Sequence, residues 1–502
     1  MTVIEYLKQS AKKFPSKVAF SDQNRELTYT ELLDHSNRIG TALIQKLGTV
    51  NDPIAVIIDR NVESICAFMG IVMSRNFYVP IDVTQPTQRI QTILDQIKPV
   101  GIISIGNILE ELKNTLEIPI FEYEDLISQE VDQMLIDGVR KHCLDTDPLY
   151  AICTSGSTGV PKGVLISHRS VRDFIPVFCE TFSFDENEVF GNQAPFDFDV
   201  SVKDIYSALY CGASVYIIPR VCFSMPKILV STLDEKKITT IVWAVSALCI
   251  AAGVNAFKHR VPGALKKVLF SGEVMPIKML NVWRKYFPDA MFVNLYGPTE
   301  ITCNCLYYII DREFGNTDKL PLGVPFKNES VLYLNDDNQP IKTGETGEIC
   351  VVGTCLGLGY YRNPEKTAAA FVQNPCNERY PELMYRTGDL AVLAEDGEYY
   401  FAARKDFQIK HMGHRIELEE IETFLNAIDG MIRASCLFDT DKNKIVAFYV
   451  ADLDKADIIN ALKADLPKYM IPNIFLPMES LPISKNGKID RQKLKELYQQ
   501  MV

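Results

Sequence analysis

Short apolar runs alternate with helix-like segments up to about residue 400, and this alternation limits the possible folds more than any other feature. The segments at 61–73 and 85–97 repeat apolar residues at helical spacing. The strand-like runs lie at 52–58, 101–105, 214–218, 239–245 and 266–272. Runs that are apolar throughout are typical of strands buried on both faces, and strands that alternate with helices pair in parallel. The sequence therefore predicts an α/β fold in which helices cover parallel sheets.

A chain of 502 residues is too long for one hydrophobic core, so we expect at least two domains. Towards the C-terminus the pattern changes to a charged stretch followed by a helical segment at 416–428 and a strand-like run at 444–451. We predict a large N-terminal domain at 1–403 and a small, mobile α+β domain at 404–502, with a hinge near Asp406.

Composition narrows the class of protein. The net charge of −12 argues against a nucleic-acid binder, because phosphate contacts need clustered Lys and Arg. The 13 cysteines are odd in number and include no CxxC pair, which indicates a reduced, cytoplasmic protein and not a disulfide scaffold. Glu5 and Lys8 interrupt the apolar start of the chain, so we expect no signal peptide.

One uncharged stretch, at 238–257, is long enough to cross a bilayer. Its first half is rich in β-branched residues, Ser246 is suited to cap a following helix, and Gly253 with Asn255 is suited to end it. We therefore predict a buried strand followed by a helix, and no membrane span.

The strongest local motif is TSGSTGVPKG at 154–163, directly after the apolar LYAIC. Hydroxyls, backbone N–H groups exposed by glycine, and one lysine are suited to bind a polyphosphate. The motif is not a P-loop, because Pro161 and Gly163 occupy the positions that a P-loop gives to Gly and Ser or Thr. The candidate phosphate-binding residues are Thr154, Ser155, Gly156, Ser157, Thr158, Gly159 and Lys162.

Further motifs follow in order along the chain. They are LTYTELLDHSNRI (27–39), YVPIDVTQPTQRI (78–90), FDVS (198–201), NLYGPTE (294–300), GEICVVG (347–353), LGLGYYRNPEKT (356–367), YRTGD (385–389), RKDFQIKHMGHRIELEEIE (404–422), LPKYMIP (466–472) and NGKIDR (486–491). With the phosphate motif, this succession resembles the adenylate-forming superfamily of amino-acid adenylation domains, acyl-CoA synthetases and luciferases. The resemblance covers nearly the whole chain and implies that the N-terminal domain is the AMP-binding one, with ATP and Mg²⁺ as cofactors.

The resemblance also implies roles for single residues. Tyr296 would stack on adenine with Asn294 at its amino edge, and Gly272 would lie beside the nucleotide. Asp389 would accept hydrogen bonds from both ribose hydroxyls, and Arg404 would lie beside the ribose and phosphates. Thr299 would contact the α-phosphate. Glu300 would bind Mg²⁺, a hard cation that takes oxygen ligands.

Lys488, in NGKIDR, is the main catalytic candidate. A carboxylate that attacks the α-phosphorus builds negative charge on the bridging oxygens, and an ammonium placed there stabilises that charge. Two positions depart from the family pattern, Ala403 and Glu419, each where the family carries glycine. Neither is a proposed catalytic group, although Ala403 restricts the backbone near the hinge.

Asp199 distinguishes between substrate classes. In amino-acid adenylation domains an aspartate at this point pairs with the α-ammonium of the substrate, whereas a buried carboxylate beside a fatty acyl chain is unfavourable. The alternative is an acyl- or aryl-CoA synthetase. The nearest resemblance is to the stand-alone D-alanine–carrier-protein ligases of teichoic acid metabolism. Ser271 replaces the cysteine of those ligases, which keeps a stand-alone adenylation domain of a nonribosomal peptide synthetase as a competitor.

The family's register places ten residues around the substrate. They are Phe198, Asp199, Val200, Lys203, Trp243, Leu269, Ser271, Leu295, Cys303 and Asn304. Trp243 and the two leucines would leave little volume, while Ser271 and Asn304 offer hydrogen bonds. We predict a small side chain of the alanine or serine class. We also predict that Lys203 points outward to Asp204 or solvent, because an inward Lys203 would select an acidic side chain.

The acceptor of the activated amino acid follows from the end of the chain. Only 14 residues come after Lys488, so we expect no carrier domain there. The acceptor thiol is expected on the phosphopantetheine of a separate acyl or peptidyl carrier protein, or on CoA. The pairs His411/His414 and Cys350/Cys355 have no further ligands at a familiar spacing, so we expect no metal there.

Overall fold

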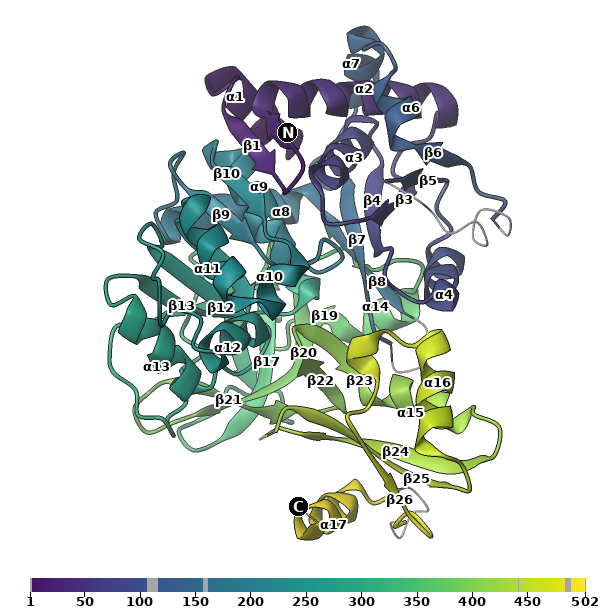
Figure 1. Cartoon of the computed structure of the whole chain (residues 1–502), viewed down its shortest axis with the longest axis vertical. Helices are drawn as coiled ribbons and strands as arrows, with labels where there is room; N and C mark the ends of the chain where they lie inside the picture. Colours follow the sequence, from purple (N-terminus) through teal and green to yellow (C-terminus); the bar gives the residue numbers. More distant parts are fainter. Residues whose placement is uncertain (1, 106–115, 157–160, 441, 484–488, 502) are drawn as a thin grey trace. The chain divides into compact units, whose positions relative to one another are not determined.

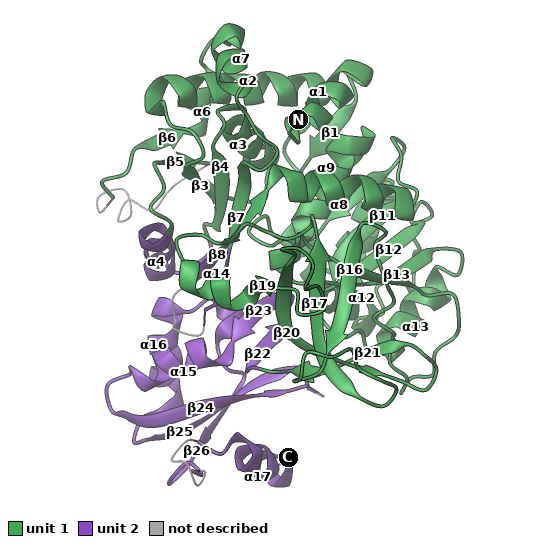
Figure 2. Cartoon of the chain, turned by 180° about the vertical axis from the view of Figure 1, so that it is seen from behind, with its two compact units in different colours: residues 1–83, 97–152, 163–405 green, residues 84–96, 153–162, 406–502 purple. Residues whose placement is uncertain are grey.

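The computed structural model describes residues 2–105, 116–156, 161–440, 442–483 and 489–501 (Figure 1). The chain forms two compact units (Figure 2). The first comprises Met1–Val83, Ile97–Ile152 and Gly163–Lys405. The second comprises Thr84–Gln96, Cys153–Lys162 and Asp406–Val502.

A nine-stranded sheet runs through the first unit in the order β15-β14-β13-β12-β11-β9-β10-β1-β2. Its strands are β1 (Val18–Ser21), β2 (Glu26–Thr28), β9 (Val189–Asn192), β10 (Ser214–Ile217), β11 (Thr240–Ala244), β12 (Lys267–Ser271), β13 (Met291–Tyr296), β14 (Leu306–Ile309) and β15 (Val324–Pro325). The pairs from β1 through β13 are parallel, and the pairs of β2, β14 and β15 at the two edges are antiparallel.

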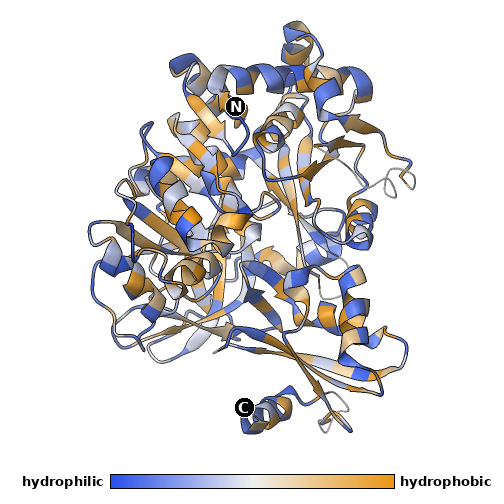
Figure 3. Ribbon diagram, viewed as in Figure 1, coloured by the Kyte–Doolittle hydropathy of each residue, from blue (hydrophilic) through white to orange (hydrophobic). Residues whose placement is uncertain are grey.

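A seven-stranded sheet has the order β18-β8-β7-β4-β3-β5-β6. Its strands are β3 (Pro53–Ile58), β4 (Phe77–Asp82), β5 (Gly101–Ser104), β6 (Ile120–Glu122), β7 (Pro148–Thr154), β8 (Lys162–Ser167) and β18 (Gly359–Tyr360). β3, β4 and β5 are buried along their whole length, which is why their sequences are apolar without alternation (Figure 3). A third sheet is antiparallel and holds β16 (Glu329–Leu334), β17 (Thr346–Gly353), β19 (Phe371–Gln373), β20 (Leu383–Leu393) and β21 (Tyr399–Arg404).

Helices of the first unit pack on these sheets. They are α1 (Ile4–Lys13), α2 (Tyr29–Leu47), α3 (Val62–Met73), α6 (Tyr123–Ile127), α7 (Gln133–Arg140), α8 (His168–Thr181), α9 (Val200–Cys211), α10 (Arg220–Ser224), α11 (Pro226–Glu235), α12 (Val245–Gly253), α13 (Ile277–Tyr286), α14 (Pro364–Ala370) and the 3₁₀ turn η1 (Thr299–Ile301). The largest core joins α3, α8 and α9 to strands of all three sheets. A separate core lies among β11, β12, α12 and α13.

The second unit is α+β. It contains the hairpin β22 (Gln408–His411) and β23 (His414–Glu417), and the sheet β24 (Met431–Asp439), β25 (Lys444–Ala451) and β26 (Ile474–Pro477). Its helices are α4 (Thr87–Ile97), which extends one residue beyond the unit, α15 (Leu418–Asn426), α16 (Lys455–Asp465), α17 (Arg491–Met501) and the 3₁₀ turn η2 (Lys468–Met470). Ile421 in α15 is fully buried, as predicted, whereas Ile416 is fully buried in β23, because the helix begins at Leu418 and not at residue 416.

The predicted α/β fold with helix-covered sheets is confirmed. The uncharged stretch at 238–257 forms β11 followed by α12, as predicted, although the helix begins at Val245 and its N-cap is Ala244 instead of Ser246. Within the described residues, no helix is long and apolar enough to cross a membrane.

Candidate functional site

Three of the predicted nucleotide-binding residues meet at Asp389. Asp389 lies in β20 and is 1% exposed. Its Oδ2 accepts a hydrogen bond from the Tyr296 hydroxyl over 2.6 Å, and its Oδ1 accepts one from Arg404 over 2.5 Å. Arg404 is the cross-strand partner of Asp389 in β21, so the sheet register fixes the pair. A buried carboxylate, a phenol and a guanidinium therefore converge from β13, β20 and β21.

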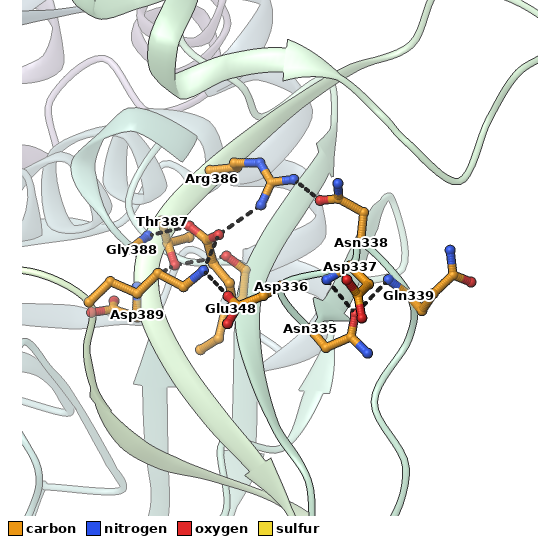
Figure 4. Close-up of polar contacts among 12 residues, drawn as sticks. Asn335, Asp336, Asp337, Asn338, Gln339, Glu348, Arg386, Thr387, Gly388 and Asp389 are labelled. Atoms are coloured by element: carbon orange, nitrogen blue, oxygen red, sulfur yellow. Dashed lines mark hydrogen bonds and ion pairs between the residues drawn. The ribbon is translucent and has the colours of Figure 1, made fainter.

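The backbone around Asp389 is shaped by its neighbours. Gly388 has a φ of +72°, a left-handed conformation that glycine adopts without steric cost. The Thr387 hydroxyl accepts a hydrogen bond from the Asp389 N–H over 3.0 Å and donates to the Ile349 carbonyl over 2.8 Å (Figure 4). Burial raises the pKa of Tyr296 well above its ordinary value, and the charge of Asp389 adds to that effect. The phenol therefore stays protonated and keeps donating to the carboxylate.

Glu300 and Thr299 lie in η1, directly after β13. Glu300 is fully buried, and its Oε1 accepts a hydrogen bond from the Tyr360 hydroxyl over 2.8 Å. Among the described residues there is no cluster of three or more His, Cys, Asp or Glu that could hold a metal by itself. Mg²⁺ is commonly held by one or two carboxylates together with phosphate oxygens and waters, so a single carboxylate fits it. Tyr360 was missed by the sequence analysis, although it lies in the LGLGYYRNPEKT motif.

The chain turns sharply after η1. Thr302 and Cys303 have φ values of +59° and +79°, which are uncommon for residues other than glycine and cost about 1–3 kcal/mol each. The Thr302 hydroxyl donates to the Cys355 carbonyl over 2.7 Å, and the Cys303 thiol donates to the Asp199 carbonyl over 3.3 Å. These bonds fix the turn and bring the segment that follows Glu300 to the start of α9.

Lys203 corrects the sequence-based prediction. We expected it to point outward, but it is 1% exposed, and its ammonium donates to Asn304 Oδ1 over 2.6 Å and to Ser271 Oγ over 3.4 Å. Asp204, the predicted alternative partner, accepts a hydrogen bond from Asn192 instead. Lys203 therefore lies among the predicted substrate-binding residues, because their oxygens can satisfy a buried ammonium.

Burial is the largest cause of the pKa shifts of Lys203 and Asp204. Burial lowers the pKa of the Lys203 ammonium, while Cys303, Asp199 and Asp204 act in the opposite direction. Burial raises the pKa of Asp204 to about 7. Asp199 itself is 7% exposed at the start of α9.

Trp243 is a second correction. Its ring contacts Trp283 and Phe223, and its indole N–H donates to the Gly191 carbonyl over 2.7 Å. Side chains alternate between the faces of a strand, so Trp243 faces the core of α12 and α13. The preceding residue, Val242, belongs to the opposite core together with Leu269 and Leu295. Trp243 therefore does not share a face with the predicted substrate residues Leu269 and Leu295, and Val242 takes that face instead.

The other apolar residues predicted to bind the substrate lie in or against the largest core. Val200, Leu269, Leu295 and Cys303 belong to one buried core, and Phe198 packs against it.

Two further residues predicted to lie beside the nucleotide are Asn294 and Gly272. The Asn294 amide donates to the Pro321 carbonyl over 2.9 Å. Gly272 has a φ of +97°, which a side chain would strain even though the space around it is open.

Part of the phosphate-binding motif belongs to the second unit. Ser155 is 3% exposed, and its hydroxyl donates to the Arg415 carbonyl over 2.7 Å and accepts from the Glu417 N–H over 3.2 Å. Thr154 Oγ1 lies 3.5 Å from the Lys162 carbonyl. The Gly156 N–H donates a hydrogen bond to the carboxylate of Glu420. Ser157, Thr158, Gly159 and Lys488 lie outside the described residues.

The predicted hinge residue Asp406 and the pair His411/His414 lie in the second unit. The carboxylate of Asp406 accepts a hydrogen bond from the Gln408 N–H over 3.2 Å. His411 Nδ1 lies 3.0 Å from the Asn443 side-chain oxygen, and the His414 ring stacks on Tyr469. The two histidines thus have structural contacts of their own.

Several known proteins resemble this chain in sequence. The sequence profile described as AMP-binding enzyme matches residues 7–361. Zwittermicin A synthase ZmaJ of Bacillus cereus is 30% identical over 491 residues, which cover 96% of this chain and 92% of that protein. Tyrocidine synthase 1 of Brevibacillus parabrevis is 29% identical over 503 residues, which cover 99% of this chain but only 45% of that protein.

Solved structures also resemble this chain in fold. The structure of holo-PA1221, described as an NRPS protein containing adenylation and PCP domains, has a TM-score of 0.85 at 22% identity. The match covers 99% of this chain and 84% of that one.

Proposed function

Because the chain belongs to the AMP-binding enzyme family, we propose that it uses ATP to activate the carboxyl group of an amino acid and then passes the aminoacyl group to a thiol. In the first step a carboxylate oxygen attacks the α-phosphorus, the bond to the β-phosphate oxygen breaks, and pyrophosphate leaves. In the second step a thiolate attacks the acyl carbon and AMP leaves. Both steps balance without a further reactant.

The residues that meet at Asp389 would bind the nucleotide. Asp389 would accept hydrogen bonds from the ribose hydroxyls, and Arg404 would lie beside the ribose and the phosphates. Tyr296 would stack on the adenine, with Asn294 and Gly272 nearby. Mg²⁺, when bound at Glu300, would neutralise charge on the phosphate oxygens. Thr299 would contact the α-phosphate, and the motif at 154–162 would bind the β- and γ-phosphates.

Lys488 would stabilise the charge that develops when the carboxylate attacks phosphorus. It would act in adenylation alone, because rotation of the small domain about Asp406 would exchange the groups at the site between the two steps. The division into domains at 1–403 and 404–502 belongs to the same proposal.

The observation that carries the proposal of an amino acid is the buried carboxylate of Asp199 at the start of α9. A charged carboxylate in an apolar surrounding is stable only with a partner charge, and the α-ammonium of an amino acid supplies one. Val200, Val242, Leu269 and Leu295, which belong to one buried core, would form the apolar surrounding. A plain fatty or aromatic acid carries no ammonium group to pair with this carboxylate.

We propose a short side chain of the alanine or serine class. Ser271, Asn304 and Lys203 would offer hydrogen bonds to a serine hydroxyl. The inward position of Lys203 favours a second candidate, a short acidic side chain such as that of aspartate, because the ammonium would pair with its carboxylate. Trp243 no longer limits the volume, so the size argument now rests on the leucines and on Lys203.

The proposed acceptor is the phosphopantetheine thiol of a separate carrier protein. The similar structure of holo-PA1221 contains both an adenylation domain and a PCP domain, which supports a carrier protein as the partner. All 13 cysteines lie in the described part of the chain and are free thiols, which supports action in a reducing compartment such as the cytoplasm.

Pyrophosphate exchange tests this function. The chain is incubated with ATP, Mg²⁺ and labelled pyrophosphate, with every proteinogenic L-amino acid, the matching D-amino acids and a set of fatty and aryl acids. We expect serine, alanine or aspartate to give the highest rate. The best substrate is then offered with a phosphopantetheinylated carrier protein or with CoA. Exchange driven best by a fatty or aryl acid, with transfer to CoA, would establish the acyl- or aryl-CoA synthetase instead.

A further inference from the structure

Glu348 is a buried carboxylate to which no role has been assigned. It lies in β17 and is 5% exposed. Its Oε1 accepts a hydrogen bond from the Gly388 N–H over 3.0 Å, and its Oε2 accepts one from Arg386 over 2.8 Å (Figure 4). The ammonium of Lys405 lies 3.4 Å from the same Oε2. One carboxylate therefore joins three donors, two from β20 and one from the residue that follows β21.

Two of these donors flank the residues proposed to bind the ribose. Gly388 directly precedes Asp389, and Lys405 directly follows Arg404. The Lys405 N–H also donates to the Gly388 carbonyl over 2.8 Å, so the two flanking residues are linked by backbone as well. The Asp389–Arg404 pair is thus held from both sides through Glu348.

Lys405 is also held at its other side. Its ammonium lies 3.2 Å from Asp336 Oδ1. Partial burial lowers the pKa of Lys405, but Glu348 and Asp336 outweigh that effect and raise the pKa above its ordinary value. The lysine is therefore charged, and both carboxylates attract it.

From this geometry we propose that Glu348 is a positioning residue for nucleotide binding. Its carboxylate fixes Gly388 and Lys405, and thereby sets the orientation of Asp389 toward the two ribose hydroxyls. The inference rests on the proposed function, because it assumes that Asp389 binds ribose. A carboxylate with a purely structural role would stabilise the sheet without affecting how the site distinguishes one ribose from another.

The test compares two nucleotides. Full-length wild type, Glu348→Gln, Lys405→Met and the exposed control Glu378→Gln are titrated by calorimetry with AMP and with 2′,3′-dideoxy-AMP, and their melting temperatures are measured. Glutamine keeps an acceptor for the Gly388 N–H but loses the charge that attracts Arg386 and Lys405. We expect Glu348→Gln to weaken AMP binding about tenfold and dideoxy-AMP binding less than about twofold. Lys405→Met should shift the same ratio in the same direction, and Glu378→Gln should leave it unchanged.

Three results would overturn the proposal. If Glu348→Gln keeps the wild-type ratio between the two nucleotides, or weakens both equally while the melting temperature falls, the residue is merely structural. If Glu348→Gln does not fold, the ratio in Lys405→Met decides, and an unchanged ratio contradicts the proposal. If the wild type itself binds both nucleotides equally, the ribose assignment of Asp389 fails, and this failure is distinguishable from that of Glu348 alone.

Discussion

The ammonium of Lys203 donates a hydrogen bond to the side-chain oxygen of Asn304 over 2.6 Å, inside the group of residues predicted to surround the substrate. The two residues are 101 positions apart in the chain. This contact places a cation among those residues, whereas the sequence alone had suggested an outward lysine.

Replacing Lys203 with methionine keeps the length of the side chain and removes its charge. We expect pyrophosphate exchange with serine or aspartate to fall by about 10–10²-fold, because Asn304 and Ser271 lose their donor and the substrate oxygen loses a partner. Exchange with alanine should fall much less. Exposed Lys258→Met is the matched control. Equal losses for alanine and for the polar substrates would show that Lys203 supports the fold and does not select the side chain.

Substitutions at Trp243 and Val242 should affect different properties. We expect the first to change the stability of the protein and the second to change its activity toward amino acids. Trp243→Ala removes a fully buried ring and should lower the free energy of unfolding by about 3–5 kcal/mol, with no change in the order of preferred amino acids. Val242→Phe adds volume on the opposite face of β11 and should reduce exchange with every substrate, the larger ones most. Thermal unfolding and the amino-acid panel are measured on both variants. A changed preference in Trp243→Ala would place that ring at the substrate after all.

Much of the fold was predictable because strands of a buried parallel sheet consist mainly of apolar residues. The runs at β3, β10, β11 and β12 are mostly apolar, and the membership of the adenylate-forming superfamily predicted from ordered motifs is confirmed.

The details of the site were less predictable. A shift of one residue moves a side chain to the other face of a strand, and the motifs on either side of Trp243 did not fix its register. The orientation of Lys203 depends on Ser271 and Asn304, which are distant in sequence, and burial of a lysine is rare without such partners. The partners of Glu348 lie on other strands, so no local pattern indicated them.

Lys488 lies outside the described residues, and its role stays a prediction. Lys488→Ala should reduce pyrophosphate exchange by about 10²–10³-fold, as the loss of a charge-stabilising contact does in other enzymes. Transfer of the aminoacyl group from added aminoacyl-adenylate to the carrier should continue at a rate close to that of wild type. Exposed Lys495→Ala is the control. Equal loss of both half-reactions would defeat the assignment.

The hinge at Asp406 is tested by restricting its backbone. Proline fixes φ, so Asp406→Pro should trap one arrangement of the domains, whereas Asp406→Ala removes the same hydrogen bond to Gln408 and keeps the rotation. We expect Asp406→Pro to retain adenylation and lose thioester formation, with Asp406→Ala close to wild type in both. Wild-type rates of both half-reactions in the proline variant would place the hinge elsewhere.

The central claim is that Asp199 recognises the α-ammonium of an amino acid, and one comparison tests it most directly. Pyrophosphate exchange by the wild-type chain is measured with the best amino acid and with the same acid lacking its amino group. We predict that the amino acid is preferred by more than about 10²-fold, because its α-ammonium adds a charge-assisted hydrogen bond to a buried carboxylate and the acid without it adds none. An acid without the amino group that drives exchange equally well, or better, would contradict the account.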